Sequence, residues 1–285
     1  MKKGINKKSG NVEYMPYHNP DLEFETFVAQ ISKRCNSDLG KAQSANLQPL
    51  PDLAAIKKSQ ALVSELQEQL ARGVDYDFGG LTNLVPLFED SRNTLFAFEE
   101  FAAVYANNLI VEEIIGHPEI WEDFPEATKY LKKLTSFAYL NARFLEIFDN
   151  DGEILDSASR ELYSIRKRIN FLRMQIQKTM QTLLNDSNIE RYLQDKFVTQ
   201  REDRYVLPIK EGSAPFVNGI VQSQSGSKST VFIEPMAIVP LNNELQLLKQ
   251  QEKQEIFRIF SEYTAAIKSE KKRILRNQEI LAFLD

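Results

Sequence analysis

Hydrophobic residues in the first half of the chain recur with helical spacing. Phe24, Phe27, Val28 and Ile31 follow the i, i+3, i+4, i+7 pattern, which predicts a helix from Leu22 to near Gly40. The same pattern predicts three further helices, which begin at Asp52, Ser91 and Glu126 and end near Gly73, Gly116 and Phe148. Together these elements indicate an all-α core domain over residues 21–151. The polar, unpatterned residues 1–20 before it are expected to form a flexible tail.

The second half of the chain carries two much longer apolar stripes. They predict one helix over about 159–192, with Asp156, Ser157 and Ser159 as candidate N-caps, and another over about 241–284. Each helix would be about 45–65 Å long at about 1.5 Å per residue. A globule cannot cover helices of this length, so we expect the two stripes to pack antiparallel on each other. The expected contact residues are Leu162, Ile165, Ile169, Leu172 and Ile176 on one side and Leu245, Leu248, Ile256 and Ile259 on the other.

The segment between the two stripes has the pattern of strands. Residues 197–207 place β-branched and aromatic residues on either side of a Glu202-Asp203 turn, and residues 219–235 read as two short strands around a Ser/Gly turn. Pro208, Pro215 and Pro235 would each interrupt a helix. The sequence therefore predicts a mainly α fold with a helical core. Two antiparallel lever helices, 152–195 and 241–285, would carry a small β-rich, clamp-like tip at 196–240.

Composition narrows the class of protein. Only 11 Gly and 11 Pro argue against a loop-rich β fold, and Cys35, the single cysteine, excludes a disulfide framework and a thiolate metal cluster. The chain has no apolar run of about 18 residues, so we expect a cytoplasmic protein that does not enter the membrane. The net charge of -5 hides an asymmetry, because residues 160–285 carry 20 basic and 15 acidic side chains. Any polyanion should therefore meet the second half, unless this excess is only a solvated surface.

The sequence contains no convincing catalytic constellation. Gly226-Ser227-Lys228-Ser229-Thr230 resembles the end of a phosphate loop, but Ser227 separates the glycine from the lysine and a strand pattern follows. We therefore expect no enzyme activity, no cofactor and no metal in this chain.

The candidate site is the β-rich tip. Phe216 and short polar side chains lie among its basic residues, which are candidate phosphate contacts. These basic residues are Lys196, Arg201, Arg204, Lys210 and Lys228. The alternative is that Arg201 and Arg204 pair with the neighbouring carboxylates and that the tip is an ordinary solvated hairpin.

The amino-acid sequence of the tip and its flanking segments resembles that of the MutS-two family, the second subfamily of the MutS ATPases. The resemblance rests on FVTQREDRYVLPIK (197–210), VFIEPMAIVPLNNEL (231–245) and GEILDSASREL (152–162), and it extends from about Leu22 to Asp285. In that family a helical core is followed by lever helices with a clamp domain, and then by an ATPase and commonly a nuclease-type domain. ATP and Mg would belong to that ATPase domain. Because the sequence stops at Asp285 inside an apolar helical pattern, we expect this chain to be a piece of a longer protein.

The resemblance implies two roles and leaves both open. Family members are associated with branched DNA in recombination control and with stalled or collided ribosomes. In either role, two copies of the protein would enclose DNA or ribosomal RNA. The competing interpretation is a mechanical or dimerisation lever with no nucleic-acid affinity of its own. Mismatch repair proper is disfavoured, since the first 150 residues predict helices where a mismatch-reading domain needs an α/β pattern.

Overall fold

The computed structural model describes residues 23–285 apart from 49, 90–93 and 227–228. The chain divides into two compact units. The first unit is the chain up to Phe144 together with Ala266–Asp285, and the second unit is Leu145–Ala265. The predicted tail, residues 1–20, lies outside the described residues. The prediction of a mainly α fold with a small β-rich tip is confirmed, because helices dominate and one four-stranded antiparallel sheet is present.

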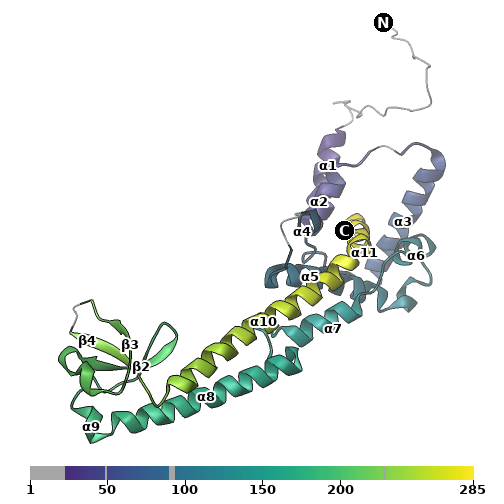
Figure 1. The fold of residues 1–285 in the computed structure, drawn as a ribbon. Helices are drawn as coiled ribbons and strands as arrows, with labels where there is room; N and C mark the ends of the chain where they lie inside the picture. Colours follow the sequence, from purple (N-terminus) through teal and green to yellow (C-terminus); the bar gives the residue numbers. More distant parts are fainter. Residues whose placement is uncertain (1–22, 49, 90–93, 227–228) are drawn as a thin grey trace, which may run out of the picture. The chain divides into compact units, whose positions relative to one another are not determined.

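The first unit is built from helices around an apolar core. Its elements (Figure 1) are α1 (Phe24–Ser32), α2 (Asp38–Ala45), α3 (Leu53–Ala71), α4 (Val85–Glu89), α5 (Phe98–Ile115), the short 3-10 helix η2 (Pro118–Trp121), α6 (Pro125–Leu131), most of α7 (Ala138–Ile147), and α11 (Lys271–Leu284). The core brings together Leu62 of α3, Ile114 of α5, Trp121 of η2 and Leu281 of α11, all nearly fully buried. Asp52 caps α3 as predicted, because the Ala55 amide donates to Asp52 Oδ1 over 2.8 Å.

The prediction of a single helix from Leu22 to near Gly40 is wrong. The structure has two helices there, and Gly40 lies inside the second one. The reason is a polar cap: Ser37 has extended backbone angles, and its hydroxyl accepts a hydrogen bond of 2.9 Å from the Gly40 amide. The chain therefore restarts as α2 rather than continuing α1.

The predicted helix from Glu126 to Phe148 is likewise two helices, α6 and α7. The backbone between them is held by a side chain of α11. Thr135 donates to Asn277 Oδ1 over 2.9 Å, and Asn277 Nδ2 donates back to the Thr135 carbonyl over 2.8 Å. Glu112 also accepts from the Phe137 amide. These side chains replace the helical hydrogen bonds that the break removes.

The helix expected from Ser91 begins later. Ser91 lies outside the described residues, and α5 begins at Phe98. Glu100 sets this start, because its carboxylate accepts from the Ala97 amide over 2.6 Å.

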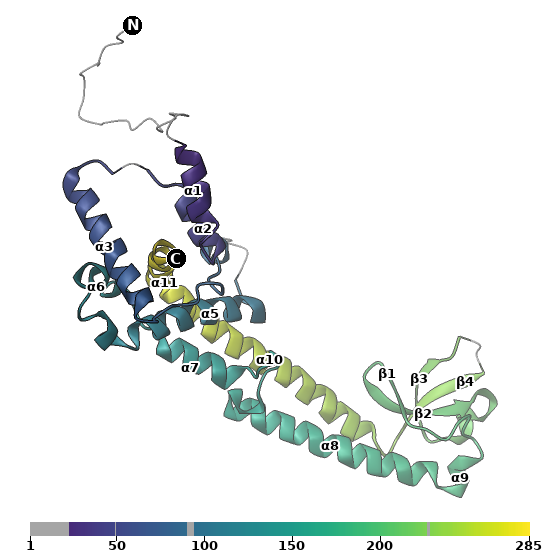
Figure 2. The same cartoon turned by 180° about the vertical axis from the view of Figure 1, so that it is seen from behind.

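In the second unit two long helices lie side by side and antiparallel, as both views show (Figures 1 and 2). They are α8 (Arg160–Leu184) and the main part of α10 (Val239–Ser269). The buried residues of the predicted stripe, among them Ile169 and Ile176, share one core with Leu245 of α10, and Leu248 packs against it. Arg166 bonds Glu252 over 2.8 Å and Arg168 bonds Glu244 over 2.7 Å, so the pairing is tied at its edges as well.

Both long helices are shorter than predicted. The first, α8, ends at Leu184, and Asp186 then caps the short helix α9 (Ser187–Glu190). The stretch 241–284 is interrupted at Glu270, whose φ and ψ are -98° and 6°, so α11 is a separate helix that belongs to the first unit. The start of α8 is as predicted. Ser159, which follows the 3-10 turn η3 (Asp156–Ala158), caps α8 by accepting a hydrogen bond of 2.9 Å from the Leu162 amide. Within the part of the chain that the structure describes, no helix is long and apolar enough to cross a membrane.

Candidate nucleic-acid interface

The tip of the second unit is a small antiparallel sheet with the strand order β1-β2-β4-β3. The strands are β1 (Thr199–Arg201), β2 (Arg204–Lys210), β3 (Gly219–Gln224) and β4 (Thr230–Pro235), with the 3-10 helix η4 (Glu211–Phe216) between β2 and β3. Its inner face packs on the paired helices through Leu207, Ile209, Val231 and Ile233. Because strand residues alternate between faces, the outer face of the sheet carries Pro208, Lys210 and Phe232.

The predicted turn between β1 and β2 is confirmed and is attached to α10. Glu202 and Asp203 have positive φ values of 50° and 63°, as a tight hairpin turn requires. Gln246 donates to the Asp203 carbonyl over 3.0 Å, and Lys249 Nζ lies 2.9 Å from Asp203 Oδ1. The pKa of Asp203 is lowered by this hydrogen bond from Lys249. The hairpin is thereby tied directly to the helix.

Arg204 is committed to a buried ion pair. It donates to both carboxylate oxygens of Glu234, over 2.8 and 3.0 Å, and Glu234 is fully buried. Gln222 and Asn242 each donate one further hydrogen bond to the same carboxylate, over 2.6 and 2.8 Å. The other amino group of Arg204 donates to Asn243 over 2.7 Å. Arg204 thus has a structural role, although its partner is the buried Glu234 and not one of the neighbouring carboxylates that the alternative interpretation named. We do not retain it as a phosphate contact.

Arg201 and Lys210 are placed differently. The Arg201 guanidinium lies 3.9 Å from the centroid of the Phe232 ring and donates to the Gln200 carbonyl and the Thr199 hydroxyl. Lys210 is exposed and donates to the Arg191 carbonyl over 3.1 Å. Among the described residues neither side chain forms an ion pair with a carboxylate, so no direct contact neutralises either positive charge.

Lys196 and two aromatic residues form the neighbouring rim of the tip. Lys196 pairs with Glu190 over 2.9 Å, and both side chains are about half exposed. The rings of Tyr192 and Phe216 are stacked, with centroids 5.5 Å apart, and Phe216 is 67% exposed. The Arg191 guanidinium lies 4.7 Å from the Tyr192 centroid. The remaining predicted contact, Lys228, lies outside the described residues.

Arg191 and Tyr192 also belong to the site, although the local sequence pattern does not point to them. They follow α9 in the sequence and reach the tip because Leu193 forms a β-bridge with Ile209. That pairing is not visible in the local sequence pattern. An exposed phenylalanine beside glycine and proline, as at Phe216, was the available signal.

A second basic surface lies on α8. The helix carries six basic residues against one acidic residue, Glu161. Its exposed side, opposite the buried stripe, presents a set that we call the outer strip: Arg160, Tyr163, Lys167, Phe171, Met174 and Lys178. The helical periodicity predicts a helix for this stretch but does not single out these residues. The spacing of Arg160, Lys167 and Lys178, which share one helix direction, was the signal that could have found them.

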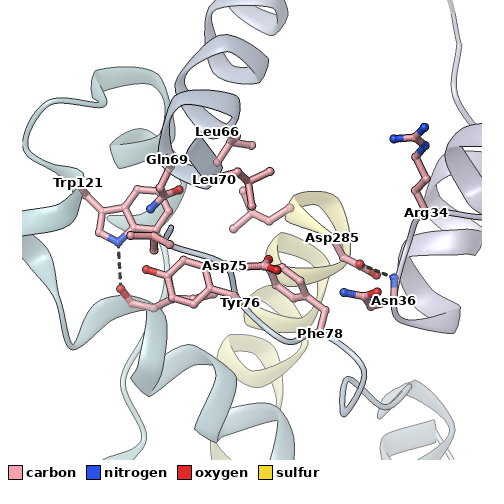
Figure 3. Close-up of a pocket in the computed structure, with 13 residues that line it drawn as sticks. Arg34, Asn36, Leu66, Gln69, Leu70, Asp75, Tyr76, Phe78, Trp121 and Asp285 are labelled. Carbon is pink, nitrogen blue, oxygen red and sulfur yellow. Dashed lines mark hydrogen bonds between the residues drawn. The ribbon is translucent and has the colours of Figure 1, made fainter. Parts of the chain in front are cut away.

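The first unit contains a cavity of about 210 Å³ (Figure 3). The rings of Tyr76 and Trp121 are stacked at 5.9 Å on its wall, and Trp121 donates to the Ile114 carbonyl over 3.1 Å. Gln69 Nε2 and the Tyr76 hydroxyl have no partner among the described residues. Burial raises the pKa of Tyr76. A cavity of this size has room for several water molecules, which can bond both atoms, so it needs no other ligand to explain its polar groups.

The segment that resembles a phosphate loop leads into a strand. Thr230 begins β4, where a nucleotide-binding loop would open a helix. The prediction that a strand follows this segment is confirmed.

A mainly α chain with paired long helices and a small sheet at one end of that pair is the architecture that the resemblance to the MutS-two family implies. No family model matches the chain. It is 32% identical over 274 residues to "Endonuclease MutS2" of Halothermothrix orenii, an alignment that covers 93% of this chain and 35% of that protein. Its identity to "Endonuclease MutS2" is also 32% for Bacillus velezensis, over 269 residues, and for Pelotomaculum thermopropionicum, over 267 residues. The chain belongs to the MutS2 family, and it spans about a third of the length of these relatives.

Proposed function

We propose that this chain is the lever and clamp part of a MutS2 protein and that its tip contacts nucleic acid. The observation that carries the proposal is the pair Arg201 and Lys210 on the outer face of the sheet. Both donate only to uncharged groups among the described residues, so their charge is available to a phosphate. The exposed Phe216, stacked on Tyr192, adds a surface on which an unpaired base can stack.

The whole protein would enclose its target with two copies of this part. The target is branched DNA or the RNA of a stalled or collided ribosome, and the chemistry of the tip suits both because phosphates and base faces are common to them. We assign the driving ATPase and any nuclease activity to other parts of the protein. The chain itself should neither bind nor hydrolyse ATP, which a nucleotide-binding titration and a phosphate-release assay can test.

The experiment is a titration of this chain with duplex DNA, branched DNA and ribosomes at several salt concentrations. Arg201→Gln combined with Lys210→Gln should weaken binding and reduce the salt dependence by nearly one unit of slope for each lost duplex contact. The matched control is Lys57→Gln with Lys58→Gln, which removes the same charge from exposed positions of α3 in the first unit. If both double variants bind as the parent does at every salt concentration, the tip does not bind nucleic acid.

A second candidate function is a mechanical module without affinity of its own. It is favoured by the attachment of the β1–β2 turn to α10, in which Asp203 contacts Gln246 and Lys249. Such contacts would transmit a movement of the helix to the sheet. A parent chain that binds none of the three targets at low salt would support this function and contradict the first.

A further inference from the structure

The outer strip of α8 combines positive charge with exposed aromatic rings. Tyr163, Phe171 and Met174 are 53%, 43% and 63% exposed, although they are apolar or aromatic. They alternate with Arg160, Lys167 and Lys178, which are exposed as well. Its ends, Arg160 and Lys178, are 18 positions apart, so the strip is about 27 Å long at about 1.5 Å per residue.

Five of the six cations of α8 fall into two groups, and Arg173 belongs to neither. Arg166 and Arg168 point toward α10, where Glu252 and Glu244 neutralise them. Arg160, Lys167 and Lys178 form no ion pair among the residues that the structure describes, and Lys167 Nζ lies 6.0 Å from the Tyr163 ring centroid. The strip therefore presents only positive charge, whereas the four basic residues that the structure describes between 196 and 240 are balanced by four carboxylates there.

We propose that the outer strip binds a nucleic-acid strand that has unpaired bases. Arg160, Lys167 and Lys178 would contact phosphates, while Tyr163 and Phe171 would stack on bases. A single strand as long as the strip carries about 8 negative charges, at about 3.4 Å per charge, so the charge complementarity is large. The interleaved rings favour nucleic acid over an acidic polypeptide, which offers charge but few flat faces. The inference extends the proposed function to a second surface, and it is tested by substitutions that leave the tip intact.

The first test removes two charges from the strip. Lys167→Gln with Lys178→Gln should reduce the slope of log affinity against log salt by about 1.4 for a single strand, since each contact contributes about 0.7. At about 0.1 M salt this corresponds to a loss of about 25-fold in affinity. The control Lys57→Gln with Lys58→Gln should change the salt slope and the affinity by less than the loss of one phosphate contact would. The probes are single-stranded DNA, RNA of the same sequence and the DNA duplex, which also show whether DNA or RNA is preferred.

The second test removes the ring. Phe171→Ala should weaken single-strand binding by at least about fivefold, leave duplex binding unchanged, and leave the salt slope unchanged. Phe171→Leu keeps an apolar side chain and should lose a similar factor, which separates stacking from general apolar contact.

Several results would overturn the inference. One is an unchanged salt slope in the Lys167/Lys178 variant, and another is equal competition by poly-glutamate. A third is a Phe171→Ala variant that changes the sedimentation of the protein alone, since this would show that the strip binds a second copy. If the strip variants bind normally while the Arg201/Lys210 variant does not, this inference fails and the proposed function stands. If the parent binds no probe, this inference fails, and the titrations with branched DNA and ribosomes decide the proposed function.

Discussion

Replacing Arg204 with alanine should destabilise the tip strongly. Glu234 is fully buried, and Arg204 supplies two of the four hydrogen bonds to its carboxylate. After the substitution the negative charge would keep only the neutral donors Gln222 and Asn242. Breaking a buried ion pair from one side costs about 3–5 kcal/mol. Since the Arg204 side chain is itself 26% exposed, water can partly replace it, and we expect a value near 3 kcal/mol.

The measurement must report on the tip. Trp121, the only tryptophan, lies in the first unit, so its fluorescence does not follow the sheet. Hydrogen exchange of the β2 and β4 amides reports on the sheet directly. If these amides exchange by opening of the sheet, a loss of about 3 kcal/mol accelerates them by about 160-fold, at 1.36 kcal/mol for each factor of ten.

Two further variants serve as comparisons for Arg204→Ala. Lys249→Ala removes an exposed pair with Asp203 and should cost at most about 1 kcal/mol. Arg204→Met with Glu234→Leu removes both charges and should recover most of the lost stability, because no unpaired charge remains. The reasoning is refuted if Arg204→Ala exchanges at the parent rate, or if the double variant is less stable than Arg204→Ala.

Three other perturbations test the fold. Ile169→Asp places a charge in the seam between α8 and α10, where Ile169 is 3% exposed, and should cost several kcal/mol in urea unfolding. Asn277→Ala should destabilise the first unit by about 1–3 kcal/mol, since it leaves the Thr135 amide and carbonyl without a partner; Trp121 fluorescence in urea measures this. The hydrogen bond from Arg258 holds the pKa of Glu255 below its ordinary value. The ionised Glu255 therefore stabilises the folded state fully above the unfolded pKa of about 4.3, and this stabilisation is lost as the pH falls through the lower pKa of the folded state. Glu255→Gln should remove this loss from a series of urea midpoints taken across acidic pH, and an unchanged acid dependence would contradict the assignment.

The parts of the fold that local sequence specifies were predictable. The cap at Ser159, the buried stripe of α8 and the turn at Glu202 and Asp203 each depend on residues a few positions apart. The break between α6 and α7 was not predictable, because Asn277, which stabilises it, is 142 residues from Thr135 in sequence. Helical periodicity continues through such a break, so the pattern alone indicates one long helix.

The same distinction applies to the candidate site. Residue type and a β-rich context were enough to select Arg201, Arg204 and Lys210, but not to separate their roles. Arg204 differs only because Glu234, 30 residues later, is brought beside it by the pairing of β2 with β4. The role of a basic residue in a small sheet thus depends on which carboxylate the strand register places next to it.

The contacts between α8 and α10 also limit where the chain can change in length. Ser159 donates to Glu255 over 2.6 Å, and Arg168 binds Glu244 nearer the sheet. One inserted residue turns the remainder of a helix by about 100°, so an insertion between Glu244 and Glu255 would carry one of these carboxylates away from its partner. Even an insertion of whole turns would slide one contact out of register with the other. Insertions and deletions among related proteins are therefore expected in the connections of the sheet, such as 211–218, and not within the paired helices.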